Sequence, residues 1–464
     1  MTVLLTAKDV AVTAGDTLLK PASLVLHKGR PFTILGETGS GKSLLAQAIM
    51  GTLPKGLCAS GSVTIGDRIL DLSQDGNHRS LWGTVIGVLP QEPWMALDPT
   101  MRAVRQVEEG YLYVRGADRD TARRSANTDL AEIALETASE KLPSQLSGGM
   151  AQRVAFAAAR AGGAAIIIAD EPTKGLDVAR RDDVIALLAK EVASGGGLLT
   201  ITHDLELARR LGGDVAIMLE GKVIEQGAAE AVFRAPSHEY TRRLIAADPA
   251  SWPMREKTAP AGRSILVAEG LAKRRGGQQL FKGRDFAVGA GEIVGITGPS
   301  GCGKSTFGDI LLGLLQPDEG IVSRSPDFAP IRFQKLYQDP PSAFPQRVTL
   351  RCALDDLVAL HRLDEKRIAP LLHRLRLPAS LLDRLPSEVS GGELQRLALL
   401  RVLLLDPVFL FADEPTSRLD LITQRETIEL LIEIAKESGC ALLIVSHDAE
   451  LIEKTSDRSI AFTL

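Results

Sequence analysis

The sequence predicts an α/β fold with a mainly parallel sheet, present as two tandem copies. The motif G-x-x-x-x-G-K-[ST] occurs twice, as GETGSGKS from Gly36 to Ser43 and as GPSGCGKS from Gly298 to Ser305. Each motif follows an apolar strand and precedes an apolar helical pattern, which is the context that a phosphate-binding loop requires. Short, wholly apolar runs then alternate with helical stretches, as in sheets that carry helices on both faces.

The repeat extends over nearly the whole chain of 464 residues, which is too long for one ordinary core. Five pairs of like residues recur at separations of 262, 247, 243, 243 and 244, by subtraction of residue numbers: Lys42 and Lys304, Gln91 and Gln338, Ser147 and Ser390, Glu171 and Glu414, His203 and His447. The fall in separation before Gln338 predicts a shortened second copy, in the region that corresponds to Gly61–Leu89. We therefore predict domains over residues 1–247 and 264–464, joined by a linker over 248–263.

The two phosphate loops predict nucleotide binding. Their glycines let successive backbone N–H groups surround phosphate oxygens, and the helix that follows directs its positive end at them. Lys42 and Lys304 would reach the terminal phosphates, while the hydroxyls of Ser43 and Ser305 would bind Mg²⁺. The predicted loop residues are Gly36, Gly39, Gly41, Lys42, Ser43 and Leu44 in the first copy and Gly298, Gly301, Gly303, Lys304, Ser305 and Thr306 in the second.

An Asp-Glu pair follows an apolar strand in each copy, as Asp170-Glu171 and Asp413-Glu414. Ligands of open α/β sheets lie beyond the carboxyl ends of the strands, so these acids should converge on the phosphate loops. We predict that the aspartates hold Mg²⁺ and that the glutamates polarise the water that attacks the γ-phosphate. D-E-P is also a common way to leave a strand, which would be a purely structural explanation.

Two further motifs recur in the same register. His203 and His447 each follow the next strand, where a histidine can donate to the γ-phosphate or simply cap a helix. A Ser-Gly-Gly sequence then begins a helical pattern in each copy, and it predicts either an anion cradle or an ordinary N-cap. These residues are Ser147, Gly148 and Gly149 in the first copy and Ser390, Gly391 and Gly392 in the second.

Composition narrows the classes of partner. A hydrophobic fraction of 45%, a charged fraction of 24% and a net charge of −4 describe a soluble globular chain for which nucleic acid is not the expected partner. The cysteines at 58, 302, 352 and 440 are scattered, so no disulfide framework, zinc or iron–sulfur site is expected. The longest apolar run, Val154–Ala169, contains Arg160 and two glycines, so no transmembrane segment is expected.

With these motifs the chain resembles a tandem pair of ABC transporter nucleotide-binding domains, which are P-loop NTPases with an antiparallel β subdomain and an α-helical subdomain. The resemblance implies that Gln91 and Gln338 are Q-loop glutamines near Mg²⁺, and that Asp177 and Asp420 lie in D-loops. It also implies ATP hydrolysis at two composite sites, neither of them degenerate. One would combine Lys42, Asp170, Glu171 and His203 with Ser390, and the other Lys304, Asp413, Glu414 and His447 with Ser147.

A finer resemblance is to the ATPases of dipeptide, oligopeptide and nickel importers. It rests on QEPWMALDP and QDPPSAFP after the two glutamines, and on the tail from GKVIEQG to HEYTRRLIAADP. It implies two integral membrane permease subunits and, through them, an external solute-binding protein, with this chain peripheral on the cytoplasmic face of the inner membrane. Docking is expected at Thr100–Glu140 and Thr349–Pro386. Peptide, nickel, metal chelate and opine all remain open as cargo.

The alternative is a soluble tandem ABC ATPase, either acting on ribosomes or DNA or serving a phosphonate-degrading complex. Translation factors of this kind usually carry a long charged linker and the DNA-repair type carries zinc-binding cysteines, and this chain has neither.

The chain also departs from the family pattern. No aromatic residue for adenine stands near Thr13 or Arg274, and the second copy is expected to lack the closing strands and tail of the first. Cys302, inside the second loop, is expected to make that site sensitive to thiol alkylation.

Overall fold

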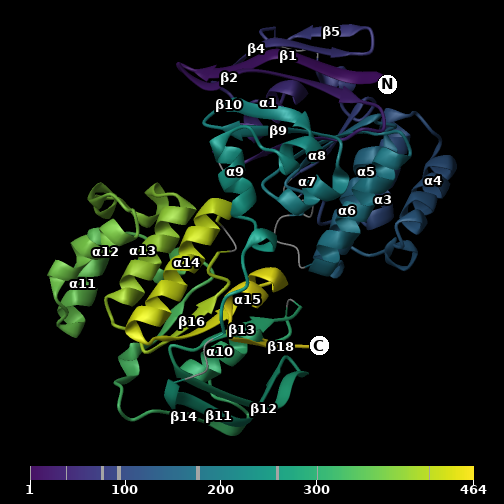
Figure 1. Cartoon of the computed structure of the whole chain (residues 1–464). Helices are drawn as coiled ribbons and strands as arrows, with labels where there is room; N and C mark the ends of the chain where they lie inside the picture. The colour runs from purple at the N-terminus through teal and green to yellow at the C-terminus, as the bar shows by residue number, and fades with distance from the viewer. Residues whose placement is uncertain are drawn as a thin grey trace. The chain divides into compact units, whose positions relative to one another are not determined.

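The computed structural model separates into two compact units, Met1–Ile245 and Ala246–Leu464. The residues that it describes are 2–37, 39–74, 78–90, 96–173, 178–257, 261–299, 301–416 and 419–463. Each unit combines a parallel sheet, flanking helices and a smaller antiparallel sheet (Figure 1). The predicted fold class is therefore confirmed.

In the first unit the main sheet has the strand order β10-β9-β3-β8-β7-β6, and only β10 runs antiparallel to its neighbour. Its strands are β3 (Phe32–Gly36), β6 (Ile86–Leu89), β7 (Ile166–Asp170), β8 (Gly197–Thr202), β9 (Asp214–Leu219) and β10 (Lys222–Ala228). Strands β3 and β8 are buried along their whole length, which explains why their sequences are almost wholly apolar, with threonines as the polar residues. The antiparallel sheet has the order β2-β1-β4-β5, with β1 (Val3–Ala14), β2 (Asp16–His27), β4 (Cys58–Ile65) and β5 (Arg68–Asp71).

Helices cover both faces of this main sheet. Helix α1 contributes Leu45 and Ile49 to a core that also holds Val10 of the antiparallel sheet and Ile34 of β3. A second core on the other face joins α3, α5 and α6 to the sheet. The helices are α1 (Lys42–Met50), α3 (Ala103–Glu109), the π-helical turn η2 (Gly110–Val114), α4 (Arg119–Glu132), α5 (Gly148–Ala161), α6 (Val178–Ala193), α7 (Leu205–Leu211), α8 (Ala229–Arg234) and α9 (Glu239–Ala246), with short 3-10 turns η1 (His78–Leu81), η3 (Glu136–Ala138) and η4 (Pro143–Gln145).

The second unit repeats this plan. Its main sheet is wholly parallel in the order β15-β16-β17-β13-β18, and its antiparallel sheet has the order β12-β11-β14. The strands are β11 (Ala261–Arg275), β12 (Gln278–Ala290), β13 (Ile293–Thr297), β14 (Glu319–Arg324), β15 (Phe333–Leu336), β16 (Phe409–Asp413), β17 (Ala441–Val445) and β18 (Arg458–Ala461). The helices are α10 (Lys304–Leu312), α11 (Leu350–His361), α12 (Ile368–Arg374), α13 (Gly391–Leu403), α14 (Leu421–Ser438) and α15 (Ala449–Thr455). The 3-10 turns are η5 (Pro249–Ser251), η6 (Pro330–Arg332), η7 (Pro340–Ala343), η8 (Glu365–Arg367), η9 (Ala379–Asp383) and η10 (Pro386–Glu388).

The expected loss of the closing strands in the second copy is wrong for one of them. Strand β18 pairs with β13 in parallel, just as β9 pairs with β3 in the first unit. Its four residues, RSIA, are half polar and mostly exposed, so they form no apolar run that the sequence pattern could have revealed. Within the predicted linker segment, Trp252 is 8% exposed and belongs to the core of the second unit.

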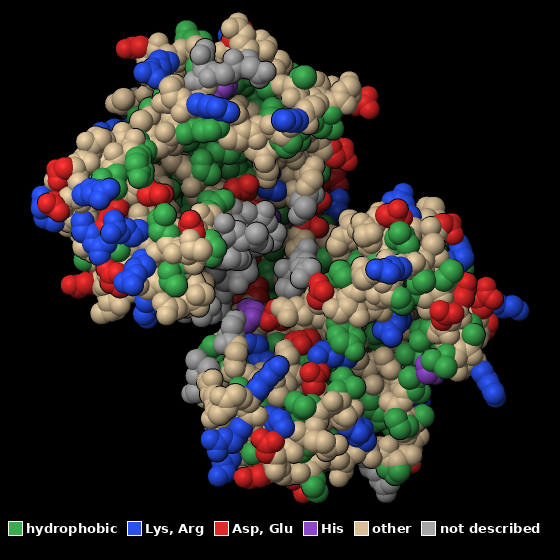
Figure 2. All heavy atoms as spheres, turned by 180° about the vertical axis from the view of Figure 1, so that it is seen from behind, with side chains coloured by type: hydrophobic (Ala, Val, Ile, Leu, Met, Phe, Trp, Pro, Cys, Tyr) green, Lys and Arg blue, Asp and Glu red, His purple; other side chains and the backbone are tan. Residues whose placement is uncertain are grey.

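The face of the molecule seen in Figure 2 carries side chains of both charges. Figure 2 shows Lys and Arg side chains interspersed with Asp and Glu over the described face. Among the described residues, no helix is both long enough and apolar enough to cross a bilayer.

Candidate functional site

The described residues of the two phosphate loops share their main features. Gly41 and Gly303, which precede α1 and α10, have φ angles of 94° and 102°, a left-handed region that favours glycine. The ammonium of Lys42 donates to the carbonyls of Gly36 and Glu37 at 2.7 and 2.8 Å. Lys304 makes the same two bonds, to the first two residues of its own loop. Each lysine is thus held over a loop whose glycines place little side-chain bulk around it.

The sheet register brings the acidic strand ends to these loops. Asp170, at the end of β7, pairs with Ile201 of β8, which in turn pairs with Ile34 of β3 just before the first loop. In the second unit Ser305 Oγ donates to Asp413 Oδ1 at 3.0 Å. A hydroxyl and a carboxylate oxygen that converge in this way are hard oxygen ligands and fit Mg²⁺. Burial raises the pKa of Asp413.

Each candidate glutamate is paired with its candidate histidine. His203 Nδ1 lies 2.8 Å from Glu171 Oε2, and His447 Nε2 lies 2.5 Å from Glu414 Oε1. Burial by itself would raise the pKa of Glu171, but the hydrogen bond and charge of His203, with the charge of Lys42, hold that pKa below its ordinary value. Glu171 is therefore ionised near neutral pH, as a group that orients a water molecule must be.

Both glutamates have an unusual backbone. Glu171 has a φ of 47° and Glu414 a φ of 48°, values that cost a non-glycine residue roughly 1–2 kcal/mol. Such strain often marks functional positions, and here it recurs at equivalent residues of the two units. The sequence carried no signal for it.

The described Q-loop glutamine also reaches this centre. Gln338 Nε2 donates to Glu414 Oε2 at 2.6 Å. Its counterpart Gln91 lies outside the described residues, as does Asp177 of the first D-loop. In the second unit the structure therefore gathers the phosphate loop, both acids, the histidine and the Q-loop glutamine.

The Ser-Gly-Gly residues lie elsewhere in each unit, at the start of α5 and α13. Ser147 Oγ accepts from Met150 N at 3.4 Å and Ser390 Oγ accepts from Glu393 N at 3.3 Å, so both serines are N-caps. Gly148, Gly149, Gly391 and Gly392 form the first turns of these helices. Asp420 is likewise the N-cap of α14, through a bond from Thr423 N of 2.9 Å.

A buried glutamine connects each of these helices, which begin at the Ser-Gly-Gly sequence (the signature sequence), to the Asp-Glu-Pro loop of the same unit. Gln152, on α5, donates to the carbonyl of Pro172, and Gln395, on α13, donates to that of Pro415 at 2.9 Å. Their exposures are only 2% and 3%. The separation of 243 between these glutamines, equal to that between the signature serines, was the sequence signal that could have identified them.

Three further residues in or next to the phosphate loops are partly or fully buried. Leu44 is half-buried and Thr306 is buried, and both belong to the first turn after the loop serine. Cys302 is 1% exposed and packs in the apolar core of the second unit. This burial contradicts the expected sensitivity to alkylation, because a reagent cannot reach the thiol without opening that core.

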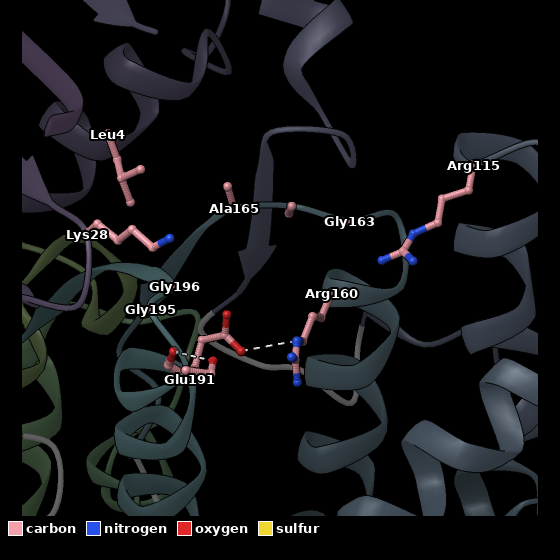
Figure 3. Close-up of a pocket in the computed structure, with 11 residues that line it drawn as sticks. Leu4, Lys28, Arg115, Arg160, Gly163, Ala165, Glu191, Gly195 and Gly196 are labelled. Carbon is pink, nitrogen blue, oxygen red and sulfur yellow. Dashed lines mark hydrogen bonds and ion pairs between the residues drawn. The ribbon is translucent and has the colours of Figure 1, made fainter. Parts of the chain in front are cut away.

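A separate cavity of about 310 Å³ lies where the parallel strands of the first unit's main sheet begin. Residues that precede β7 and β8 line it. Figure 3 shows Lys28, Arg115 and Arg160 around it, with Arg160 Nε 3.1 Å from Glu191 Oε2. Because the phosphate loop follows the opposite end of β3, this cavity is not part of the nucleotide site.

Comparison with known proteins agrees with this geometry. The family model described as ABC transporter matches residues 19–174 and 281–417. "Glutathione import ATP-binding protein GsiA" of Salmonella typhi is 31% identical over 507 residues, covering 95% of this chain and 81% of the relative. "Uncharacterized ABC transporter ATP-binding protein YejF" of Escherichia coli K12 is 32% identical over 472 residues, covering 94% and 88%.

Solved structures share the tandem fold. An archaeal ribosome recycling factor, aABCE1, in complex with the stalk protein aP1 aligns with a TM-score of 0.68 and 22% identity over 96% of this chain and 84% of its own. A structure titled "RNase-L Inhibitor" aligns with a TM-score of 0.68 and 21% identity over 98% and 87%. At these identities the likeness concerns the fold alone.

Proposed function

The chain belongs to the ABC transporter family and is an ATPase that uses ATP with Mg²⁺; from this premise we propose that it is the energy-coupling subunit of an importer of short peptides. The observation that carries the proposal is the 31% identity to a glutathione import ATPase over 95% of this chain. That alignment includes both ATPase domains, so the relative resembles the tandem arrangement and not merely one domain.

The proposed reaction is hydrolysis of ATP: a water oxygen bonds to the γ-phosphorus, the bond from that phosphorus to the β–γ bridging oxygen breaks, and ADP and inorganic phosphate leave. Bound Mg²⁺ would neutralise charge on the phosphate oxygens. In the second unit Ser305 and Asp413 would hold the metal with Gln338, as Ser43, Asp170 and Gln91 would in the first. Glu171 and Glu414 would orient the attacking water, and the adjacent histidines would fix the carboxylates and donate to the phosphate.

We further propose that each site is completed by the signature serine of the other half, as the family resemblance implies. Ser390 would serve the site of Lys42, and Ser147 the site of Lys304. Fusion of both halves in one chain raises the effective concentration of each for the other to roughly millimolar. Binding of ATP would then close the halves and hydrolysis would release them.

An exposed apolar residue recurs at one position of the two helical subdomains. Tyr113, in η2, is 80% exposed and Leu360, in α11, is 75% exposed. Their separation is 247, the same as that of the Q-loop glutamines. Single exposed apolar residues are common, but the same exposure at one register in both units favours a docking function. We propose that each contacts one permease subunit.

The cargo is proposed from the relative alone. Glutathione, a short peptide, is the first candidate because of the printed function of the relative. Nickel, metal chelates and opines are the other solutes to compare.

The decisive experiment is a pull-down of the tagged native chain from detergent-solubilised membranes, with ATPase activity measured on the recovered material. Recovery of two multi-span membrane proteins in stoichiometric amounts would support the importer. Recovery of ribosomes or of a metabolic complex, without membrane proteins, would support the soluble alternative instead. Reconstitution of the recovered complex with its solute-binding protein would then compare glutathione with nickel as stimulators of hydrolysis.

A further inference from the structure

We propose that the cavity at the start of the parallel strands of the first unit binds a small organic dianion, such as a dicarboxylate or a phosphate monoester. The cavity has a volume of about 310 Å³ and is separate from the nucleotide site. A volume near 300 Å³ is sufficient for a small metabolite. The proposal adds a second kind of ligand site to the first unit, and it does not depend on which solute is transported.

Positively charged side chains from three segments line this cavity. Lys28 directly follows β2, Arg115 directly follows η2, and Arg160 lies at the end of α5. Lys28 and Arg115 point towards each other from opposite sides of the cavity (Figure 3). Cations that surround one cavity repel one another, so an anion between them is favourable.

Of these three cations, only Arg160 has a carboxylate partner among the described residues. Arg160 Nε lies 3.1 Å from Glu191 Oε2, so the charges of this pair offset each other. Lys28 and Arg115 form no ion pair with a described carboxylate. Asp129 is near enough to Arg115 for their charges to interact, but its carboxylate accepts a tyrosine hydroxyl at 2.7 Å and does not line the cavity. Two positive charges therefore face the cavity without a direct partner.

Two glycines leave the room that these two cations occupy. A Cβ at Gly163 would lie 3.3 Å from Nε and from Nη2 of Arg115, and a Cβ at Gly195 would lie 2.9 Å from Cε of Lys28. Gly163 and Gly195 also have φ angles of 95° and 89°, which favour glycine. A side chain at either position would crowd the cation beside it. The backbone around the cavity thus accommodates both Lys28 and Arg115.

The remaining wall favours an organic anion. Leu4, Ala164 and Ala165 line the same cavity and offer aliphatic surface. The carbon atoms of a ligand gain free energy when they leave water for such a surface. Carboxylate and phosphate oxygens match the planar donors of arginine and the compact charge of lysine. A short carbon chain with two negative charges would therefore satisfy the aliphatic wall and offset both Lys28 and Arg115.

The cavity and the nucleotide site lie at opposite ends of the same strands. Strands β7 and β8 begin directly after Ala165 and Gly196, which line the cavity. Their other ends lead to Asp170 and His203 of the nucleotide site. A dianion in the cavity should therefore bind together with ATP and not in competition with it.

The test measures binding by calorimetry, with succinate and glycerol phosphate as probes and acetate as the singly charged comparison. The full chain is first saturated with a non-hydrolysable ATP analogue and Mg²⁺, so that the phosphate loops are already filled. Low ionic strength is needed because Lys28 and Arg115 are exposed and salt would screen their charges. At least one dianion should reach half-saturation at about 1 mM or less, and bind at least about tenfold more tightly than acetate.

Matched variants locate the binding. Lys28→Gln combined with Arg115→Gln should weaken it at least about tenfold, because both unpaired charges are removed. Lys8→Gln combined with Arg68→Gln removes the same charge from exposed residues of the antiparallel sheet and should leave the binding unchanged. Ala165→Glu keeps both cations but adds an acid to the wall, and it should abolish the binding. Retained binding of the ATP analogue shows in each case that the variant is folded.

Two results would overturn the proposal. One is that neither dianion binds more tightly than acetate to the nucleotide-loaded chain. The other is that dianion binding persists in the double variant of Lys28 and Arg115, or is lost equally in that of Lys8 and Arg68. Neither result would affect the proposed importer function, which the pull-down tests separately.

Discussion

The helix after the phosphate loop ends differently in the two units. In the first, α1 ends beneath Trp82, whose indole N–H donates to the carbonyl of Met50 at 2.9 Å. In the second, α10 ends beside Arg324, whose Nε donates to the carbonyl of Leu311 at 3.0 Å. The last carbonyls of a helix need partners, and a cation there also opposes the helix dipole. Both units therefore provide a hydrogen-bond donor for a carbonyl at the end of this helix, but they use different residues to do so.

The cores next to these helices also use different residues at corresponding positions. The second unit packs a cluster of edge-to-face phenylalanines, with Phe281, Phe307 and Phe462 at centroid distances of 5.3 to 6.0 Å. By the separation of 262, Leu19 and Leu45 correspond to Phe281 and Phe307. Both leucines are buried. Similar phosphate loops are thus supported by aliphatic packing in one unit and aromatic packing in the other.

The strongest test of the shared geometry removes the glutamate carboxylates. Glu171→Gln combined with Glu414→Gln should lower ATP hydrolysis on the order of a hundredfold or more while ATP stays bound, because a positioned base is lost. The measurement is phosphate release together with retention of labelled ATP. Each single variant would show whether the two sites contribute equally, and Glu256→Gln, an exposed change, is the control. Unchanged turnover in the double variant would contradict the assigned role.

Gly308 allows a test of the aromatic packing in the second unit. A Cβ at this position would lie 2.2 Å from the ring of Phe411, whereas the first unit has Ala46 and Ile168 at the corresponding positions. Gly308→Ala should lower the free energy of unfolding of the second unit by about 1–3 kcal/mol through overpacking. Denaturant unfolding measures it. Adding Phe411→Ile should restore stability, and a stabilising effect of Gly308→Ala alone would contradict the argument.

The proposed docking residues give a smaller effect. Tyr113→Ala and Leu360→Ala should each weaken recovery of the permease subunits about 5- to 10-fold, the scale of a moderate interface contact. The affinity of the isolated chain for ATP should not change. Ile69, which is 74% exposed on β5, supplies the matched control as Ile69→Ala. If Ile69→Ala weakens recovery equally, the two positions have no special role.

The smallest effect concerns Glu225, in the tail segment of the first unit. Its carboxylate accepts bonds from Ser237 N at 2.7 Å and His238 N at 3.1 Å. Burial would raise the pKa of Glu225, but these bonds, together with hydrogen bonds from the side chains of Thr241 and Ser237, lower it to about 2. The stabilisation is therefore complete above the ordinary pKa of 4.5 and is lost as the pH falls towards 2.

The melting temperature of Glu225→Gln should accordingly lie slightly below that of the wild type at pH 7, and the difference should vanish by about pH 2. Glu230→Gln, in the neighbouring helix α8, is the control and should show no such trend. A difference that grows on acidification would contradict the assigned bonds.

The sequence by itself determined the duplication, the α/β class and the positions of the phosphate loops, acids and histidines. These features are local: a strand, a glycine-rich turn and a helix start are encoded within about ten neighbouring residues. The five like pairs sufficed to align the two halves. The family resemblance followed from the same short motifs, and the comparisons confirmed it.

Only the tertiary structure decided how these residues meet. Ser305 and Asp413 are 108 residues apart, and Gln338 and Glu414 are 76 apart, so neither bond could be deduced from spacing. The burial of Cys302 and the pairing of β18 depend on the packing of other segments. The contact of Lys335 with Asp413 arises because parallel pairing sets β15 beside β16, so a residue that is unremarkable in sequence lies next to a predicted Mg²⁺ ligand.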